Sequence, residues 1–178
     1  MLQSAISDKT WKIHHKPHEQ ARREWIATRP PVSRALDVGC GQGYMTSAIQ
    51  ATHIVGCDVN TTHLDVARRF FLDNDLDIPV MEGDIYDLPF SDKKFDAVYC
   101  LETLEHLEDP VPAAREIRRV CRGTLYVSVP AHGHMRSTPG HLQDFTSESL
   151  AELFGADATD VIMMEPFALL EVSCGSHT

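Results

Sequence analysis

The sequence predicts an α/β fold in which a mostly parallel sheet carries helices on both faces. Short apolar segments recur between residues 35 and 130, and helical segments separate most of them. Uninterrupted apolar runs of this length are typical of parallel strands buried on both faces. Strand–helix–strand order favours right-handed crossovers between parallel neighbours. The expected strands are ALDVGC (35–40), HIVGCDV (53–59), IPVMEGD (78–84), FDAVYCL (95–101) and TLYVSVP (124–130).

Helical periodicity and end signals place the other elements. Pro30 and Pro31 end the first helix, and Thr61 is the expected cap of the third. The expected helices cover residues 16–28, 44–51, 61–74, about 111–120 and 146–155. VIMME (161–165) and ALLEVS (168–173) predict a terminal pair of strands. We expect residues 1–178 to form one domain, in which an N-terminal helical segment (1–30) precedes the core (31–178).

The composition narrows the class of protein. A formal net charge of −10 argues against a nucleic-acid partner, because phosphate neutralisation needs a basic face. The five cysteines form no CxxC pair, which favours a reduced, cytoplasmic protein without a zinc cluster. No apolar run approaches the roughly 18 residues of a membrane-spanning helix, so membrane insertion is not expected. The one basic cluster is interpreted as a solvated helix face made of Arg115, Arg118, Arg119 and Arg122.

The strongest motif is a glycine loop between the first expected strand and the next helix, DVGCGQGY (37–44). Its glycines allow a tight turn and close approach of a ligand to a helix N-terminus. The dinucleotide fingerprint GxGxxG would need glycine where Tyr44 stands, and no phosphate-loop lysine follows. Asp37 precedes the loop, where a carboxylate favours a cation over a pyrophosphate. S-adenosylmethionine carries an ammonium and a sulfonium, so the sign of its charge fits.

Two more acids follow the next two expected strands. Asp58 ends the second, where a carboxylate can accept both hydroxyls of a ribose. Asp84 ends the third, where it can accept from an adenine amino group. The alternatives are a solvated acid at Asp58 and a turn-forming residue at Asp84. Acids at the carboxyl ends of three successive strands meet at one crevice, which favours the ligand-binding interpretation.

These motifs together resemble those of a known family. ALDVGCGQGY, VGCDVN, EGDIYDLPFSDKKFDAVYCLETLEHLEDP and GTLYVSVP are similar to successive motifs of class I S-adenosylmethionine-dependent methyltransferases. Within that family, the chain most resembles the group of the ubiquinone and menaquinone biosynthesis methyltransferases, over residues 33–172. The resemblance implies a Rossmann-like sheet of seven strands, with one antiparallel strand of the last hairpin beside the fifth strand.

The resemblance also implies a cofactor site. Asp37 and the glycine loop would hold the methionine part, and the backbone near Leu101 would meet its ammonium. Asp58 would bind the ribose, Val59 and Ile85 would flank the adenine, and Asp84 would face its amino group. The implied cofactor-binding residues are Asp37, Gly39, Gly41, Gly43, Tyr44, Asp58, Val59, Asp84, Ile85 and Leu101.

Histidines mark the acceptor side. A general base helps methyl transfer only when the acceptor must lose a proton, and a histidine can serve near neutral pH. His106 follows the fourth strand, and His132, His134 and His141 follow the fifth. The alternative for each is a loop histidine bonded to the backbone. The predicted catalytic residues are His106, His132 and His141.

A metal is the remaining question on this side. On a helix, Glu102, Glu105 and His106 would share one face and could bind a divalent cation, with a fourth ligand from the histidine-rich loop. The pattern resembles the catechol-type O-methyltransferase of ubiquinone synthesis and the small-RNA 3′-end 2′-O-methyltransferases. The alternative is a first helical turn in which acids are favoured by the dipole. A metal is not expected; if one binds, these three residues are its ligands.

The predicted function is transfer of a methyl group from S-adenosylmethionine to a small or carrier-bound metabolite, with O-methylation preferred. The alternatives are a metal-assisted RNA 2′-O-methyltransferase, a cofactor-binding protein without transferase activity, and an NAD-dependent oxidoreductase. Only the first helix and the 131–145 loop are available to cover the acceptor, so we expect an open site or closure by a second subunit of a homodimer. No motif of comparable specificity identifies the acceptor.

Overall fold

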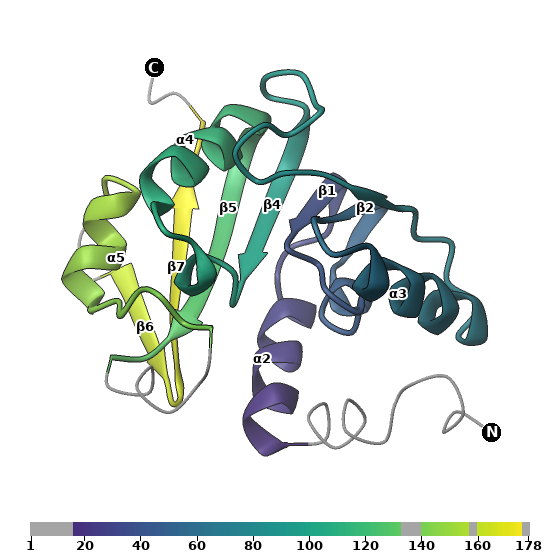
Figure 1. The fold of residues 1–178 in the computed structure, drawn as a ribbon, viewed down its shortest axis with the longest axis horizontal. Coiled ribbons are helices and arrows are strands. Elements are labelled where there is room, and N and C mark those ends of the chain that lie inside the picture. The colour runs from purple at the N-terminus through teal and green to yellow at the C-terminus, as the bar shows by residue number, and fades with distance from the viewer. Residues whose placement is uncertain (1–15, 133–139, 157–159, 176–178) are drawn as a thin grey trace.

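The computed structural model describes residues 16–132, 140–156 and 160–175, which include a seven-stranded sheet (Figure 1). Its strand order is β3-β2-β1-β4-β5-β7-β6. All pairings are parallel except those of β7, which runs antiparallel to β5 and β6. The expected fold class is therefore confirmed. The strands are β1 (Val32–Val38), β2 (Ala51–Asp58), β3 (Val80–Glu82), β4 (Phe95–Leu101), β5 (Cys121–Pro130), β6 (Val161–Met164) and β7 (Phe167–Ser173).

Helices cover both faces of the sheet because alternate strand residues point to opposite sides. Val98 and Cys100 of β4 pack in a core with residues of α4 and α5, whereas Tyr99 packs with Trp25 and Ile26 of α2. Figure 1 shows α4 and α5 together beside β5 and β7, and α3 beside β2 at the other end of the sheet. The helices are α2 (Pro17–Ala27), α3 (Thr61–Asp73), α4 (Pro110–Val120) and α5 (Ser147–Leu153), with 3-10 turns η2 (Thr46–Ala48) and η3 (Leu104–His106).

The helix expected over residues 44–51 is wrong. Only the three residues of η2 are helical there, and β2 already begins at Ala51. Side chains take the polar groups that a helix would use: the Tyr44 carbonyl accepts from Arg23 and from the Ser47 hydroxyl, and Thr46 donates to Asp37. Such local hydrogen bonds compete with helix formation.

Two smaller differences concern the ends of elements. Asn60, not Thr61, caps α3, because its side-chain oxygen accepts from the amides of Thr62 and His63 at 3.0 and 3.2 Å. β5 begins at Cys121, three residues before the expected start, because a bulge between Cys121 and Thr124 lets the strand continue pairing with β4.

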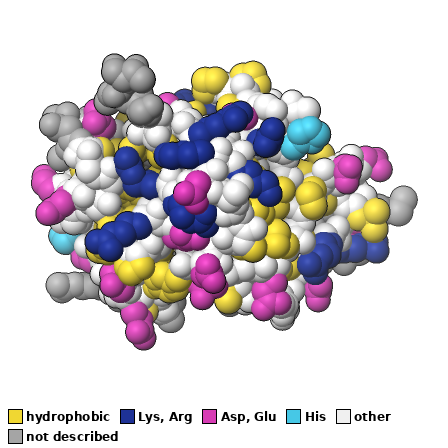
Figure 2. Space-filling model, turned by 90° about the horizontal axis from the view of Figure 1, so that it is seen from above, with side chains coloured by type: hydrophobic (Ala, Val, Ile, Leu, Met, Phe, Trp, Pro, Cys, Tyr) yellow, Lys and Arg dark blue, Asp and Glu magenta, His cyan; other side chains and the backbone are white. Residues whose placement is uncertain are grey.

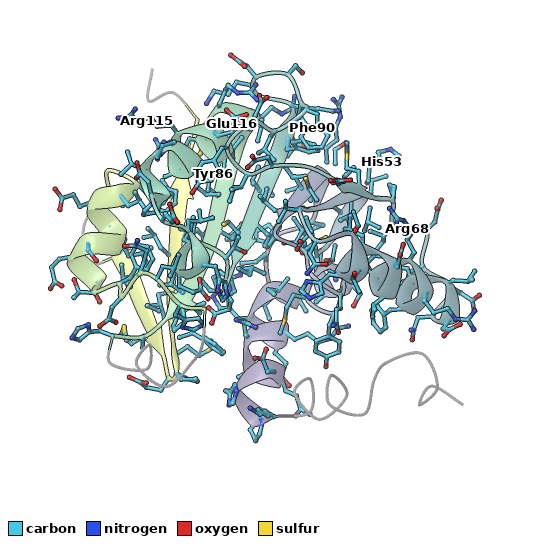
Figure 3. All side chains as sticks on the ribbon, in the orientation of Figure 1. His53, Arg68, Tyr86, Phe90, Arg115 and Glu116 are labelled. Atoms are coloured by element: carbon cyan, nitrogen blue, oxygen red, sulfur yellow. The ribbon has the colours of Figure 1, made fainter. Side chains whose placement is uncertain are left out.

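Two arginines of the predicted basic cluster form ion pairs. Arg119 contacts Glu116 at 2.6 Å and Asp92 at 2.7 Å, and Arg122 pairs with Asp96. Figure 2 shows Lys and Arg side chains interspersed with Asp and Glu on the face seen from above, and Figure 3 shows Arg115 pointing away from the body of the protein. Arg115, Arg118 and Arg119 lie on α4, as a helix face requires, whereas Arg122 lies in β5, so the prediction is wrong for that residue. Within the described ranges, no helix is long and apolar enough to cross a membrane.

Candidate functional site

The glycine loop leaves β1 with all three glycines at positive φ: +72° at Gly39, +52° at Gly41 and +82° at Gly43. A Cβ on Gly39 would lie 2.3 Å from the Thr103 hydroxyl, and one on Gly43 would lie 2.5 Å from the Phe71 ring. A Cβ on Gly41 would meet nothing within 4 Å. Gly39 and Gly43 are therefore required by internal packing, and Gly41 faces open space that a ligand can occupy.

A cavity of about 640 Å³ opens beside Gly41 at the carboxyl ends of the parallel strands. Its lining brings together predicted cofactor residues from three separate loops. These are Gly39, Gly41, Asp58, Val59, Asp84 and Ile85. The lining also includes His63, Tyr86, Glu102, Thr103 and His106. A parallel sheet of this order has its ligand crevice at this edge.

Asp58 is already oriented in the absence of a ligand. Its two carboxylate oxygens accept from the amides of Gly41 and Asn60, each at 2.8 Å. These bonds hold the glycine loop against the end of β2. Because a carboxylate has about four acceptor positions, it keeps capacity for the two hydroxyls of a ribose.

Asp84 forms a turn, which was the alternative to adenine binding in the sequence analysis. It also lines the larger cavity. Its Oδ1 accepts from the Tyr86 amide at 2.9 Å. Ile85 is buried between this turn and the core, whereas Val59 on the other side of the cavity is 71% exposed. An exposed apolar side chain at a cavity lined by strand ends is suited to cover the face of an aromatic ring.

A second cavity of about 150 Å³ adjoins the first at Gly39. It is lined by Asp37, Tyr44 and Leu101, three of the predicted cofactor-binding residues, and by two residues of α2, Glu19 and Arg22. Asp37 is buried and accepts from the Thr46 hydroxyl at 2.7 Å. Burial raises the pKa of Asp37 to about 7, and the Thr46 hydrogen bond partly opposes this shift.

Arg22 is a site residue that sequence reasoning missed. Arg22 is only 6% exposed. Its Nη2 contacts Glu19 Oε2 at 2.6 Å, and its Nη1 lies 3.2 Å from Glu102 Oε1. Its guanidinium carbon lies 4.3 Å from the centre of the Phe167 ring. The available signal was its place one turn before Trp25 on an amphipathic helix. That position alone does not reveal contacts with β4 and β7.

Glu102 does not share a helical face with Glu105 and His106, because the helix expected there is absent. Glu102 has φ +50° and lies outside η3, which begins at Leu104. Its Oε1 accepts from the Ser128 hydroxyl at 3.0 Å and faces Arg22. Burial raises the pKa of Glu102 to about 7, although the Arg22 charge opposes this shift.

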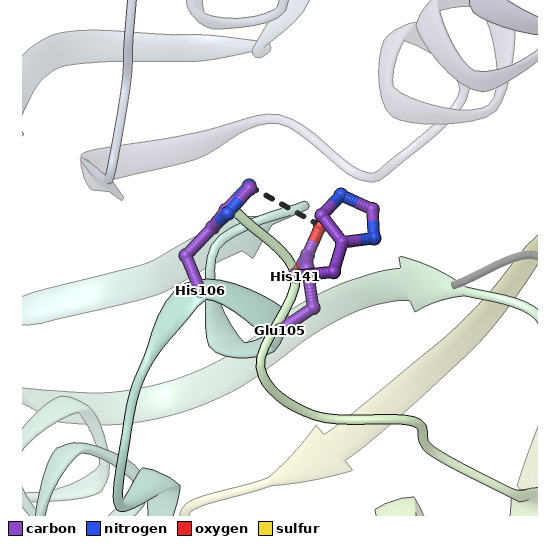
Figure 4. A group of neighbouring side chains, drawn as sticks. All are labelled: Glu105, His106 and His141. Carbon is purple, nitrogen blue, oxygen red and sulfur yellow. Dashed lines mark ion pairs between the residues drawn. The ribbon is translucent and has the colours of Figure 1, made fainter. Parts of the chain in front are cut away.

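Glu105 and His106 instead meet His141, a residue of the segment between β5 and α5 (Figure 4). One ligand atom of each residue lies within 4.8 Å of the others. Glu105 is 1% exposed, and neither of its carboxyl oxygens has a hydrogen-bond partner among the described residues. Burial and the nearby Glu102 charge raise the pKa of Glu105 to about 9. The buried His141 Nδ1 likewise has no partner in the described ranges.

The other two predicted histidines lie elsewhere. His132 is exposed, and its Nδ1 lies 3.1 Å from Asp144 Oδ2. It lines neither of the two cavities described above. His134 lies outside the described residues. Of the three predicted catalytic histidines, only His106 lines the larger cavity.

Residues 36–127, just over half of the chain, match the family described as "Methyltransferase domain". The chain belongs to this methyltransferase family. This confirms the family resemblance found in the motifs, and with it S-adenosylmethionine as the expected cofactor. The match begins at Leu36 in β1 and ends at Val127 in β5, so it includes the glycine loop, Asp58, Asp84 and the Glu102–His106 segment.

Individual relatives agree with this assignment. The ubiquinone biosynthesis O-methyltransferase of Haemophilus ducreyi is 35% identical over 104 residues, 53% of this chain and 44% of that protein. This chain therefore spans less than half the length of that relative. A putative S-adenosyl-L-methionine-dependent methyltransferase from Methanococcus maripaludis has the same fold, with a TM-score of 0.72, 17% identity, and coverage of 99% and 94% of the two chains. The cyclase SpnF is also similar, with a TM-score of 0.67, 25% identity, and coverage of 82% and 59%.

Proposed function

We propose that this chain transfers the S-methyl group of S-adenosylmethionine to an oxygen of a small or carrier-bound metabolite. The observation that carries the proposal is the pair of cavities joined at Gly39. The larger cavity has strand-end acids suited to a nucleoside. The smaller has a buried carboxylate and a buried guanidinium suited to a free amino acid. S-adenosylmethionine is an amino acid joined to a nucleoside through a sulfonium, and so matches both.

Each part of the cofactor has a proposed counterpart. Asp37 faces the ammonium and the sulfonium, and Arg22 supplies the positive charge for the carboxylate. Asp58 accepts from the ribose hydroxyls with the acceptor positions that the two amides leave free. Ile85 packs on the adenine, and Asp84 accepts from its amino group.

Methyl transfer itself is an in-line displacement. The acceptor oxygen bonds to the methyl carbon, the carbon–sulfur bond breaks, and the sulfonium becomes a neutral thioether. The protein has to hold the two reactants in line and to receive the proton of a hydroxyl acceptor.

His106 is the proposed proton acceptor. Its Nδ1 lies 2.9 Å from the Gly140 carbonyl, and a carbonyl can only accept, so Nδ1 carries the hydrogen. The neutral imidazole then keeps its lone pair on Nε2, the atom available to take a proton.

A divalent metal is a second candidate for activation of the acceptor, favoured by the group of Glu105, His106 and His141. A carboxylate and two imidazoles suit Zn²⁺ or Mn²⁺, and a cation would satisfy the buried oxygens of Glu105 and the buried His141 Nδ1. When bound, the metal would supply Lewis-acid polarisation of the acceptor oxygen. His106 would then be a ligand rather than a base.

The two alternatives differ in a binding measurement. If a metal binds, thermal unfolding of the wild-type protein shifts upward with Zn²⁺ or Mn²⁺ and returns with a chelator, and His141→Ala abolishes the shift. Equal unfolding temperatures with metal and with chelator would exclude the metal site, and the role of His106 as a general base would remain as the proposal.

The proposed reaction is tested with methyl-labelled S-adenosylmethionine and a panel of phenol, catechol, amine and thiol acceptors. The expected product carries the label as an O-methyl ether. Label on nitrogen or sulfur alone would contradict O-methylation. Tight binding of S-adenosylhomocysteine without transfer to any acceptor class would favour a protein that binds the cofactor but does not transfer its methyl group. The similar protein SpnF is described as a cyclase, so this fold also carries other activities.

Two further proposals concern the whole chain. We infer that residues 1–178 fold as one unit, because α2 and the sheet share a core and both line the smaller cavity. We infer a cytoplasmic location from the five cysteines, all of which are buried and free. A single cooperative unfolding transition is expected, and separate melting of an N-terminal unit would contradict the first proposal.

A further inference from the structure

Glu102 is held in an unusual position at the end of β4. Its φ of +50° lies in the left-handed region, which residues other than glycine rarely adopt. Two bonds to Ser128 of β5 keep it there: the Glu102 amide donates to the Ser128 carbonyl at 2.9 Å, and the Ser128 hydroxyl donates to Glu102 Oε1 at 3.0 Å. Strained backbone of this kind persists where the surrounding structure enforces it, often at functional sites.

The orientation of Glu102 brings its carboxylate to Arg22, which comes from a distant part of the chain. Arg22 is the only buried cationic side chain in the described ranges. Its Nη2 is taken by Glu19 of the same helix, and its Nη1 lies 3.2 Å from Glu102 Oε1. A buried charge is costly unless it is paired, so these two acids fix the guanidinium, Glu19 from α2 and Glu102 from the residue that follows β4.

Part of the guanidinium is still unsatisfied. Nε and Nη1 of Arg22 have no hydrogen-bond partner among the described residues, and Arg22 lines the smaller cavity. An anionic ligand in that cavity would provide the missing acceptor. Asp37, on the same cavity, offers the complementary negative charge. The cavity therefore presents one charge of each sign, as the two ends of a free amino acid require.

We propose that Glu102 is a positioning residue for the cofactor: it holds Arg22 against the smaller cavity, where the guanidinium meets the carboxylate of the methionine part. This inference rests on the proposed function. It assigns Glu102 to the donor side of the site, whereas its sequence pattern with Glu105 and His106 suggested a metal ligand. Ser128 supports the same arrangement by fixing the Glu102 carboxylate.

Binding of two ligands distinguishes a role of Glu102 at the amino acid part of the cofactor from a general structural role. S-adenosylhomocysteine carries the amino acid part, and 5′-methylthioadenosine lacks it while keeping the nucleoside and the sulfur. In Glu102→Gln, which keeps the size and removes the charge, affinity for S-adenosylhomocysteine should fall about tenfold, the usual scale for a charged hydrogen-bonding partner. Glu102 also lines the larger cavity, but glutamine keeps its size and no nucleoside group is assigned to it, so affinity for 5′-methylthioadenosine should stay within about twofold.

A double-mutant cycle tests the coupling to Arg22. Arg22→Met should lower affinity for S-adenosylhomocysteine by at least as much as Glu102→Gln, and the double variant should be little worse than Arg22→Met alone, because both changes remove one interaction. Arg22→Lys, which restores the charge, should recover part of the affinity. Asp65→Asn, an exposed acid on α3, is the matched control and should bind both ligands as the wild type does.

Each outcome is decisive. Equal loss of both ligands in Glu102→Gln would mean that Glu102 only supports the fold, and additive losses in the double variant would mean that it does not act through Arg22. Unchanged binding with reduced turnover would place Glu102 on the acceptor instead. All three overturn the proposal. If the wild-type protein bound neither ligand, the proposed function itself would fail.

Discussion

The acids on the proposed donor side and on the proposed acceptor side of the site differ in how their oxygens are satisfied. On the donor side, the three strand-end acids already have partners: Asp37 has Thr46, Asp58 has two amides, and Asp84 has the Tyr86 amide. On the acceptor side, the buried oxygens of Glu105 and the buried His141 Nδ1 have none among the described residues.

This difference indicates that the two sides meet their ligands in different ways. Acids held by fixed hydrogen bonds lose little further freedom on binding, so the acids of the donor side are pre-organised. Buried groups without partners need a proton, a cation or a ligand to complete them. The donor side should therefore respond to mutation as a binding site, and the acceptor side as a site of chemistry.

Gly41→Val should have the largest effect, and it tests the donor side. The new side chain would enter the open space beside the loop, so binding of S-adenosylhomocysteine should be abolished in calorimetry. Gly155→Val is a matched control, because Gly155 also has positive φ and open space at its Cβ position. The control carries the same backbone strain and should still bind. Binding of S-adenosylhomocysteine by Gly41→Val at wild-type affinity would contradict the claim that the ligand occupies the space beside Gly41.

His106→Ala should come next, and it tests the acceptor side. Turnover should fall about a hundredfold, the usual contribution of a general base, while affinity for S-adenosylhomocysteine stays unchanged. His53→Ala, an exposed histidine of β2, is the control for loss of an imidazole. Unchanged turnover in a labelled-methyl assay would remove His106 from the chemistry.

Asp58→Ala should weaken the binding of S-adenosylhomocysteine by on the order of 1 to 3 kcal/mol, because hydrogen bonds to a charged group are lost. The loss includes the anchor to the Gly41 amide. Calorimetry at constant pH measures it, and turnover at saturating cofactor should change much less. A variant that binds as tightly as the wild type would contradict the ribose assignment.

Asp37 should give the smallest effect at each step, a change per pH unit in the pH dependence of stability. Burial raises its pKa from the ordinary value of 3.8 to about 7, so the folded state keeps a proton that the unfolded state has lost. The contribution is therefore fully present below pH 3.8 and is lost as pH rises to about 7. As this contribution is lost, the free energy of unfolding falls by at most on the order of 1 kcal/mol per pH unit in that window. In Asp37→Asn this slope should disappear from denaturant-unfolding curves; an unchanged slope would place its origin elsewhere.

Local patterns predicted the sheet well, and they pointed to the residues that the structure gathers at the two cavities. β4 has the bounds expected from the apolar run 95–101, because strands buried on both faces are marked by continuous apolar residues. The loop after β1 was found from its glycines, although only Gly41 among the three has open space at its Cβ position. The helix at 44–51 failed because Arg23, twenty-one residues away from Tyr44, binds its carbonyl, and no local pattern contains that contact.

The rest of the site depends on contacts between distant segments. Arg22 and Glu102 meet because α2 packs across the end of β4, and Glu105 meets His141 only through the loop after β5. The helical spacing of Glu102, Glu105 and His106 suggested one cluster, but the positive φ of Glu102 sends its carboxylate to the donor side. Sequence spacing predicts neighbours only where the assumed helix forms.

A calorimetric titration with S-adenosylhomocysteine and with NAD tests the central claim most directly, because the two ligands share a nucleoside and differ in the group attached to it. The two joined cavities predict that S-adenosylhomocysteine binds, that NAD does not, and that Gly41→Val abolishes binding while Gly155→Val retains it. Binding of NAD without binding of S-adenosylhomocysteine would contradict the account.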